Sequence, residues 1–220
     1  MRAAHRRLRA QHGPFRPKPR LEPLDELILT VLSQHTSDLN RDRAFAGLKA
    51  RFPTWQQVLD ARPSEIADAI RPGGIAEVKA RRILAILREI GAREGSLDLG
   101  RLATMSDEEV TAYLCELPGV GPKTAACVLV FSLGRPAFPI DTHVHRIVRR
   151  LGWIDEKTSA ERAARELTPR IPPELRYDLH VALIDHGRAV CKAKMPRCSA
   201  CSVFDLCETG SALLAAGRAV

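Results

Sequence analysis

Lys123 stands in the first turn of a predicted helix, directly after a turn of sequence Gly119-Val120-Gly121-Pro122. The helix dipole disfavours a cation there, so the position is unusual for a lysine that is only solvated. An amine must lose its proton before it can act as a nucleophile, and desolvation or a neighbouring cation favours that loss. Lys123 is therefore a candidate amine nucleophile, and the alternative interpretation is an ordinary surface lysine.

The turn before Lys123 has features that suit contact with an anion. Two glycines around one apolar residue allow the backbone to approach a ligand closely, and Pro122 suits the first turn of a helix. Free amides at that helix start favour an anion such as a phosphate. A plain helix-helix turn is the alternative. A Walker-type loop is excluded by its spacing, because proline and not glycine precedes Lys123, and no strand leads into the turn.

Asp141 directly precedes a helix-like stretch and is predicted to be its N-cap. A carboxylate at a helix start is favoured in its charged form, which also suits an electrostatic partner for a positively charged reaction intermediate. His143 and His145 follow within one turn. They lack the i, i+4 spacing of a metal-binding pair, so we expect them to pack or to contact phosphate.

Four of the six cysteines crowd into one short stretch of the chain, namely Cys191, Cys198, Cys201 and Cys207. Because no export signal is apparent, we expect these thiols in the cytosol, which keeps thiols reduced. This argues against a disulfide framework. Four thiolates are the standard cage of a [4Fe-4S] cluster. Zinc also accepts four sulfurs, but its sites usually pair two knuckles across a longer loop, so we predict iron-sulfur over zinc. Three basic side chains in this loop predict either a phosphate contact or a solvated loop: Lys192, Lys194 and Arg197.

The elements that position these residues are predicted to be helices. Apolar residues recur at intervals of three and four through residues 24–32, 75–90, 110–114, 125–133 and 144–151. Strand-like alternation is nearly absent, so we expect an all-α protein of about ten short helices. Arg135-Pro136 is the best candidate for a domain junction. Residues 208–220, rich in Ala and Gly, are expected to form a frayed end.

Composition and charge limit the class of protein. A chain of 220 residues with 45% apolar side chains can bury a substantial core. No apolar run approaches the roughly 18 residues of a membrane span, and the N-terminus lacks a secretory signal, so we expect a cytoplasmic protein without a membrane partner. The net charge is +8, but residues 1–20 hold seven Lys and Arg and no acids, which leaves 27 basic against 26 acidic groups. That basic segment is either a solvated tail or short surface helix, or a contact to phosphates.

Taken together, these residues resemble the endonuclease III family of the helix-hairpin-helix DNA glycosylase superfamily. The matching pieces are residues 117–125, 140–143 and 185–188 and the cysteine spacing, in the family's order and separations. The resemblance implies a six-helix barrel domain over residues 21–135 and an iron-sulfur cluster domain over residues 1–20 and 136–220. It also implies a monomer that holds double-stranded DNA in the cleft between the domains, nucleoid-associated when on DNA.

The resemblance also implies a chemistry. The lysine that matches Lys123 attacks C1′ of the damaged nucleotide, and the aspartate that matches Asp141 assists it and stabilises the developing charge. The resulting covalent imine permits β-elimination of the 3′ phosphate. The expected activity is therefore that of a bifunctional DNA glycosylase and AP lyase of base excision repair, which acts on oxidised pyrimidines and abasic sites.

Chemistry on a base requires its extrusion from the duplex and a plug for the vacated stack. By family position, Gln34, His35 and Ile75 supply that plug. From the residues alone, Gln34 and His35 would be a helix end and Ile75 a loop hydrophobe. Many relatives have Gln where His35 falls and a Tyr-Asn-like pair where this chain has Ala76-Glu77, which bears on lesion preference. The other expected DNA contacts are Gly119, Val120, Gly121, Thr124, His143, Lys192, Lys194 and Arg197.

Two other functions fit parts of the pattern. A mismatch-specific adenine or thymine glycosylase of the same superfamily would share the hairpin, aspartate and cluster, but the adenine enzyme usually lacks the attacking lysine. A non-catalytic DNA-binding or redox protein would use the hairpin and cluster only to bind DNA. Covalent trapping with borohydride discriminates between a catalytic Lys123 and a binder.

Overall fold

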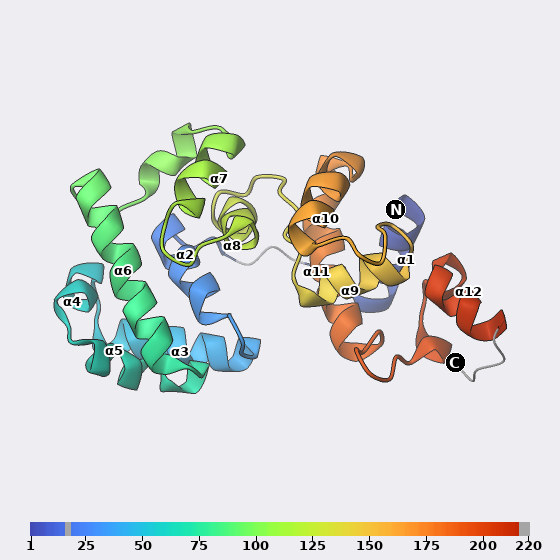
Figure 1. Cartoon of the computed structure of the whole chain (residues 1–220), viewed down its shortest axis with the longest axis horizontal. Helices are drawn as coiled ribbons and strands as arrows, with labels where there is room; N and C mark the ends of the chain where they lie inside the picture. The colour runs from blue at the N-terminus through green and yellow to red at the C-terminus, as the bar shows by residue number, and fades with distance from the viewer. Residues whose placement is uncertain (16–18, 216–220) are drawn as a thin grey trace. The chain divides into compact units, whose positions relative to one another are not determined.

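The computed structural model describes residues 1–15 and 19–215, and within that range the chain has twelve α-helices and no strand (Figure 1). The prediction of an all-α fold is confirmed. The described chain divides into two compact units, one formed by Pro19–Arg135 and the other by the described residues on both sides of it. We call them the hairpin unit and the cysteine unit, after the candidate features that each contains.

The hairpin unit contains seven α-helices: α2 (Pro23–Leu32), α3 (Asp38–Arg51), α4 (Trp55–Asp60), α5 (Pro63–Ala69), α6 (Ala76–Glu94), α7 (Asp107–Cys115) and α8 (Pro122–Cys127). The 3-10 helices Arg71–Gly73 and Gly100–Thr104 lie between them, and the π-helix Val128–Ser132 continues α8. Local signals set the helix starts. Thr54 and Ser106 each cap a helix reciprocally with the side chain three residues on.

The core of the hairpin unit is apolar and comes mainly from α2, α6, α7 and α8. Its fully buried side chains include Leu27, Ile28, Val31, Ile83, Leu87, Val110, Leu114, Ala125 and Val128. These residues recur at helical spacing, so each helix turns one apolar face inward. The long helix α6 packs against α2, α4 and α5, and it therefore supports the loops that join them.

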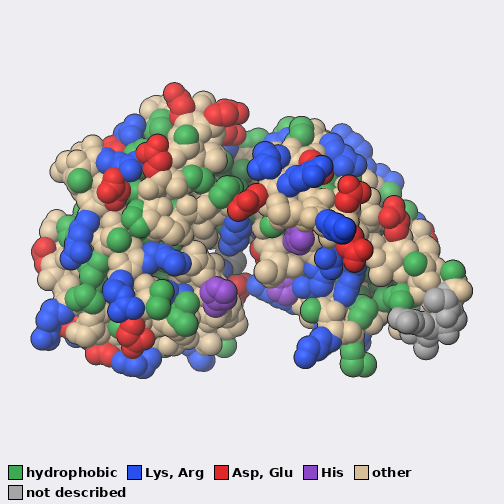
Figure 2. All heavy atoms as spheres, in the orientation of Figure 1, with side chains coloured by type: hydrophobic (Ala, Val, Ile, Leu, Met, Phe, Trp, Pro, Cys, Tyr) green, Lys and Arg blue, Asp and Glu red, His purple; other side chains and the backbone are tan. Residues whose placement is uncertain are grey.

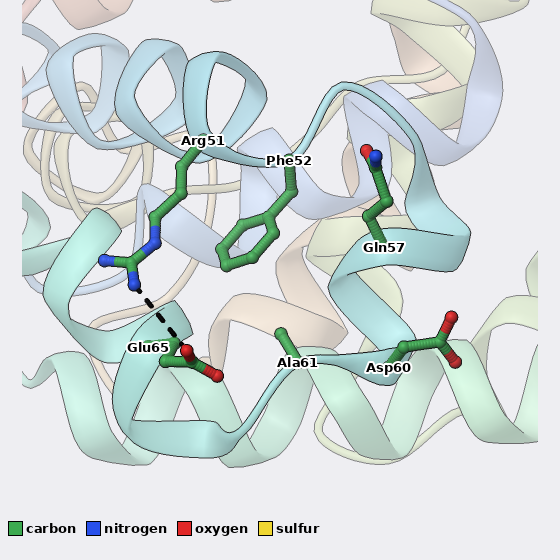
Figure 3. Close-up of a pocket in the computed structure, with 6 residues that line it drawn as sticks. All are labelled: Arg51, Phe52, Gln57, Asp60, Ala61 and Glu65. Atoms are coloured by element: carbon green, nitrogen blue, oxygen red, sulfur yellow. Dashed lines mark ion pairs between the residues drawn. The ribbon is translucent and has the colours of Figure 1, made fainter.

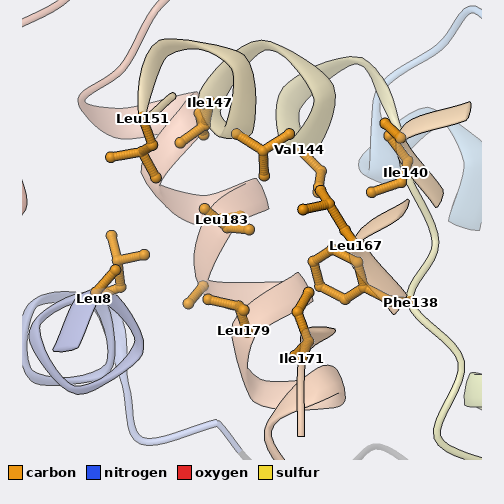
Figure 4. Packing of buried hydrophobic residues seen from close by; sticks show 14 of the residues in the cluster. Leu8, Phe138, Ile140, Val144, Ile147, Leu151, Leu167, Ile171, Leu179 and Leu183 are labelled. Carbon is orange, nitrogen blue, oxygen red and sulfur yellow. The ribbon is translucent and has the colours of Figure 1, made fainter. Parts of the chain in front are cut away.

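The cysteine unit contains α1 (Arg2–His12), α9 (Thr142–Arg150), α10 (Ala160–Leu167), α11 (Pro173–Ala189) and α12 (Glu208–Ala215). The 3-10 helices Thr168–Arg170, Cys198–Ala200 and Phe204–Leu206 complete it. Figure 4 shows its core, in which Leu8 of α1, Leu179 and Leu183 of α11, and Leu151 directly after α9 point toward one another. Both ends of the described chain therefore contribute to one hydrophobic core.

The basic N-terminal segment is a helix that packs against α11. Three of its arginines pair with acids of the same unit: Arg2 with Glu174 at 3.2 Å, Arg9 with Asp178 at 3.4 Å, and Arg7 with Asp205. Over residues 2–12 the segment is thus the short surface helix of the alternatives weighed above and not a solvated tail. Arg16 and Lys18 lie outside the described residues.

The end of the described chain is also more ordered than expected. A frayed end was predicted for residues 208–220, but Glu208–Ala215 form α12. Gly210 is buried, and a Cβ added to it would lie 2.9 Å from the Phe204 ring. That close contact fixes the helix against the preceding loop, so the prediction is wrong for this stretch. Residues 216–220 lie outside the described part.

Candidate active site

The turn between α7 and α8 is a compact hairpin. The Val120 N–H donates to the Leu117 carbonyl at 3.1 Å, and Gly119 has a φ of +73°, a left-handed conformation that favours glycine. The Val120 side chain is only 7% exposed, so it anchors the turn in the core of the unit. Among the described residues, the amides of Gly121 and Lys123 have no backbone acceptor.

Lys123 and Thr124 follow the hairpin in the first turn of α8. The side chain of Lys123 is partly exposed, and this first turn contains no acidic residue. Thr124 is 4% exposed, and its N–H donates to the Gly121 carbonyl at 2.9 Å. The structure therefore places Lys123 at the surface of the hairpin unit and the side chain of Thr124 in the interior.

Asp141 belongs to the cysteine unit and is the N-cap of α9. Its Oδ1 accepts a hydrogen bond of 2.7 Å from the Val144 N–H, and its carbonyl accepts one of 2.8 Å from the His145 N–H. The predicted capping role is confirmed. These bonds fix the carboxylate at the start of the helix, at the positive end of the helix dipole.

His143 is held by its neighbours within the cysteine unit. Its Nδ1 lies 3.2 Å from a guanidinium nitrogen of Arg146, and that same nitrogen donates to the Gly187 carbonyl at 3.0 Å. A Cβ on Gly187 would come within 2.8 Å of the His143 ring. Glycine at this position therefore lets α11 approach α9 closely enough to hold the imidazole in place.

Two loops of the hairpin unit carry the residues predicted to enter the DNA stack. His35 and Ile75 are exposed, and they are the two non-glycine residues with positive φ in the described chain, at 54° and 40°. Gln34 is partly buried, and its side-chain oxygen accepts a hydrogen bond from Arg82. Sequence reasoning gave no sign of the left-handed backbone at either residue. After Ile75, Ala76 is buried and Glu77 is exposed.

The four clustered cysteines lie close together in the cysteine unit. Burial raises the pKa of Cys198, Cys201 and Cys207, and the neighbouring thiols raise each pKa further; that of Cys201 reaches about 11. The thiols also contact polar groups. Arg150 donates to the Cys191 sulfur at 3.2 Å, and the Gly210 N–H donates to the Cys207 sulfur at 3.4 Å. A cationic centre beside Cys198, Cys201 and Cys207 would offset the effect that raises the pKa of these three thiols.

The arrangement of these thiols bears on which metal group they fit. In the described chain, no group of three or more His, Cys, Asp or Glu side chains converges on a position for one metal ion. An iron-sulfur cluster makes no such demand, because each thiolate binds a different iron. The donor set, four neighbouring thiols of which Cys191 and Cys207 accept from N–H groups, fits the predicted cluster.

The cysteine loop presents its basic side chains to solvent. Lys192, Lys194 and Arg197 are all exposed. Arg150 fixes the loop backbone by donating to the carbonyls of Lys192 and Ala193 at 2.8 and 2.9 Å. These basic side chains are thus free to meet an anionic surface while their backbone is held.

A pocket of about 300 Å³ lies elsewhere in the hairpin unit, between the end of α3 and the start of α5 (Figure 3). Its lining includes Phe52 and the ion pair of Arg51 with Glu65, at 3.8 Å. None of the predicted site residues lines it. We therefore assign it no part in the candidate chemistry.

The surface carries charges of both signs. On the face drawn in Figure 2, Lys and Arg side chains are interspersed with Asp and Glu side chains. This agrees with the near balance of charge outside residues 1–20. No helix in the described chain meets the length and apolarity that a membrane crossing requires.

Comparison with known proteins places this fold and site in a family. Residues 28–173 match the HhH-GPD superfamily of base excision DNA repair proteins. That match covers more than half of the chain, so the chain belongs to this superfamily. Within it, the chain is an endonuclease III-like DNA glycosylase, and the predicted resemblance is confirmed.

Several relatives support this placement. The chain is 36% identical to endonuclease III of Thermotoga maritima over 85% of this chain and 83% of that protein. It is 32% identical to endonuclease III of Escherichia coli over 84% and 83%. An Arabidopsis thaliana protein named as a DNA glycosylase is 43% identical over 78% of this chain, but the match spans only 58% of that protein's length.

Solved structures agree. A trapped covalent intermediate of an endonuclease III with DNA superposes with a TM-score of 0.82 at 28% identity, covering 97% of this chain and 96% of that chain. A non-covalent endonuclease III–DNA complex gives the same values. A thermostable thymine-DNA glycosylase, at 18% identity and a TM-score of 0.78, shares the fold.

Sequence reasoning missed several residues that shape these sites. Arg146 and Arg150 hold the cysteine loop from α9, and their i, i+4 spacing on one helix face was an available signal. Lys79 and Arg82 touch the loops of the hairpin unit. They lie in a run of charged residues that reads as a solvated helix face, so no sequence signal marked them.

Proposed function

We propose that this chain is a bifunctional DNA glycosylase and AP lyase that excises oxidised pyrimidines and then cuts the strand. One observation carries the proposal. Lys123 stands at the surface in the first turn after the hairpin, in a chain whose fold matches an endonuclease III that was trapped in a covalent intermediate with DNA. A glycosylase that used water instead of an amine would leave no such intermediate.

In the first step, the unprotonated Nζ of Lys123 attacks C1′ of the damaged nucleotide. The bond between C1′ and the base breaks, and the base leaves with the bonding electrons and is protonated. Positive charge develops on the sugar as this bond lengthens. The Asp141 carboxylate, held at the start of α9, stabilises that charge and accepts the proton that the amine loses.

In the second step, the sugar ring opens and the C1′–nitrogen bond becomes an imine. Loss of a proton from C2′ sends electrons toward the imine and expels the 3′ phosphate from C3′, which breaks the strand. Water then hydrolyses the imine and frees Lys123. The same amine therefore serves both base release and strand cutting.

We assign DNA binding to residues of both units. Gln34, His35 and Ile75 fill the stack that the extruded base vacates, since extrusion costs a few kcal/mol. The hairpin Gly119-Val120-Gly121 and the exposed Lys192, Lys194 and Arg197 contact phosphates, which fixes position without reading sequence. His143 lies beside Asp141 in sequence and adds a contact on the cysteine unit.

Cys191, Cys198, Cys201 and Cys207 would hold a [4Fe-4S] cluster. When bound, the cluster cross-links the loop that presents the basic side chains and neutralises the repulsion among the four thiolates. The donor set described above supports this assignment. Zinc is the alternative, and metal analysis separates the two.

Borohydride trapping tests the proposal. Duplexes with one oxidised pyrimidine, one abasic site, or an adenine or thymine mismatch are incubated with the protein and sodium borohydride. The proposal predicts a covalent protein-DNA adduct, from reduction of the imine to an amine, on the oxidised and abasic duplexes. Base release without an adduct on the mismatched duplex would favour the mismatch glycosylase. Binding without adduct or base release would favour a non-catalytic protein.

A further inference from the structure

Lys79 is a fully buried lysine in the middle of the hairpin unit. It lies in the first turns of α6, and its side chain is 0% exposed. Its Nζ donates to the Leu32 carbonyl and to the Gly73 carbonyl, each at 2.7 Å. Burial, and to a lesser degree the charge of Arg82, lowers its pKa. A buried ammonium is costly unless it is compensated, so its two acceptors need an explanation.

Both acceptors are the last carbonyls of helices. Leu32 ends α2, and Gly73 ends the 3-10 helix Arg71–Gly73. Carbonyls at a helix C-terminus lack intrahelical partners and carry the negative end of the helix dipole, which favours a cation. Lys79 thus closes two helix ends with one side chain. A side chain without N–H donors would leave both carbonyls buried and unpaired.

The backbone that follows each of these carbonyls is strained. His35 comes three residues after Leu32 and Ile75 two residues after Gly73, and both have left-handed φ values. Such a conformation in a residue other than glycine costs energy and persists where the surrounding structure determines it. Ile75 is 49% exposed, so packing of its own side chain cannot supply that constraint. The two helix ends that Lys79 holds, from which these loops begin, can supply it.

Arg82 lies about one turn beyond Lys79 on α6 and also contacts the loops of the hairpin unit. It is partly buried and donates through a guanidinium nitrogen to the side-chain oxygen of Gln34. It also lies against the hairpin. A Cβ on Gly119 would fall 2.8 Å from the Arg82 Cδ and 2.9 Å from its Cζ, so the glycine leaves room for this guanidinium.

We infer that Lys79 and Arg82 are positioning residues for DNA binding. Lys79 sets the spacing between the Gln34-His35 turn and the Ile75 turn, and Arg82 ties the first of these turns to the hairpin at Gly119. The three loops are thereby arranged before DNA arrives, and no ordering of them is needed on binding. This inference rests on the proposed function, because it assumes that the three loops meet DNA.

The test compares Lys79→Met and Arg82→Met with the matched control Arg81→Met, an exposed neighbour on α6. A duplex with 2-aminopurine beside the lesion reports opening of the stack by its fluorescence, and this readout needs binding but no chemistry. A single-stranded oligonucleotide with an abasic site reports attack by Lys123 through borohydride trapping, and it needs no extrusion.

We expect both variants to lose most of the fluorescence change and to slow single-turnover excision on the duplex by about tenfold or more, since small misplacements are costly. Trapping on the single strand should stay within about threefold of the wild type, because the first turn of α8 that carries Lys123 is held by its own backbone hydrogen bonds to the Gly121 carbonyl. Arg81→Met should match the wild type throughout.

Unchanged fluorescence in Arg82→Met would overturn the inference, as would equal losses on the duplex and the single strand, which would indicate a purely structural role. If Lys79→Met does not fold, Arg82→Met decides, because Arg82 is only partly buried. If the wild type opens the stack but forms no adduct on any substrate, the proposed catalytic function fails, while the fluorescence still decides the positioning role.

Discussion

The Oδ1 of Asp141 accepts a 2.7 Å hydrogen bond from the backbone N–H of Val144 and so caps α9. One carboxylate therefore has two roles in this protein, a structural role at the helix start and a proposed electrostatic role toward the sugar. Two substitutions separate these roles, because asparagine keeps a capping oxygen and loses the charge, whereas alanine loses both.

Asp141→Asn should leave the free energy of unfolding nearly unchanged, since Asn and Asp cap equally well, while Asp141→Ala should cost about 1 kcal/mol. Both should slow base release by a factor of about 100 or more, because the charge is lost in each. Urea unfolding and single-turnover excision measure the two effects. Full excision activity in Asp141→Asn would remove the carboxylate from the mechanism.

Lys123→Gln should abolish strand cutting and borohydride trapping and should leave DNA affinity within a few fold. The variant loses the amine that forms the imine but keeps the hairpin and its backbone amides. Lys157→Gln, at an exposed lysine of the other unit, is the control and should be trapped like the wild type. Gel analysis of the adduct decides, and an adduct in Lys123→Gln would point to a different nucleophile.

The purified protein should be yellow-brown with broad absorbance near ~400 nm and should contain iron and sulfide. Cys207→Ser should lower the iron content, because it removes one of the four thiols. Cys115→Ser should leave the iron content unchanged, because Cys115 belongs to the hairpin unit and is not one of the four clustered cysteines. A colourless protein that contains zinc would reverse the assignment of the metal group.

Gly119→Ala should destabilise the protein by about 1–2 kcal/mol, because Gly119 has a left-handed backbone and an added Cβ meets Arg82. Gly121→Ala should cost less than about 1 kcal/mol. Its φ is −121°, and no atom lies within 4 Å of an added Cβ. Thermal or urea unfolding of the pair tests the difference, and equal losses would contradict the assigned strain.

Tyr113 should reduce stability at high pH. Burial, with the nearby Glu94 carboxylate second, raises its pKa to about 12. The folded state therefore holds the phenol proton more tightly than the unfolded chain, whose tyrosine titrates near ~10. This difference in pKa stabilises the folded state fully below pH ~10, and the stabilisation is lost as the pH rises toward 12. Tyr113→Phe should show a smaller loss between these values in urea unfolding curves.

Helical periodicity anticipated much of the frame that carries these sites. The apolar pattern of residues 75–90 predicted a helix that the structure extends over Ala76–Glu94. The pattern of residues 125–133 predicted one helix, whereas the structure has α8 followed by a π-helix over Val128–Ser132. The capping role of Asp141 was predicted because a short polar residue before an apolar periodic run is a local signal.

The contacts that shape the candidate DNA loops could not be predicted in this way. Lysine is the residue type most often solvated, and Lys79 is buried only because carbonyls from two distant helix ends converge on it. The left-handed backbone of Ile75 contradicts the preference of a β-branched residue, so local propensity argued against it. Both features depend on tertiary structure.

The packing of α1 on α11 has a consequence for synthesis of the chain. The hairpin unit is one continuous stretch, so it leaves the ribosome complete and can fold as soon as it emerges. The cysteine unit cannot fold so early. Leu8 of α1 stays exposed until α11 and the cysteine loop have been translated. The unit that gathers the thiols therefore forms after the hairpin unit.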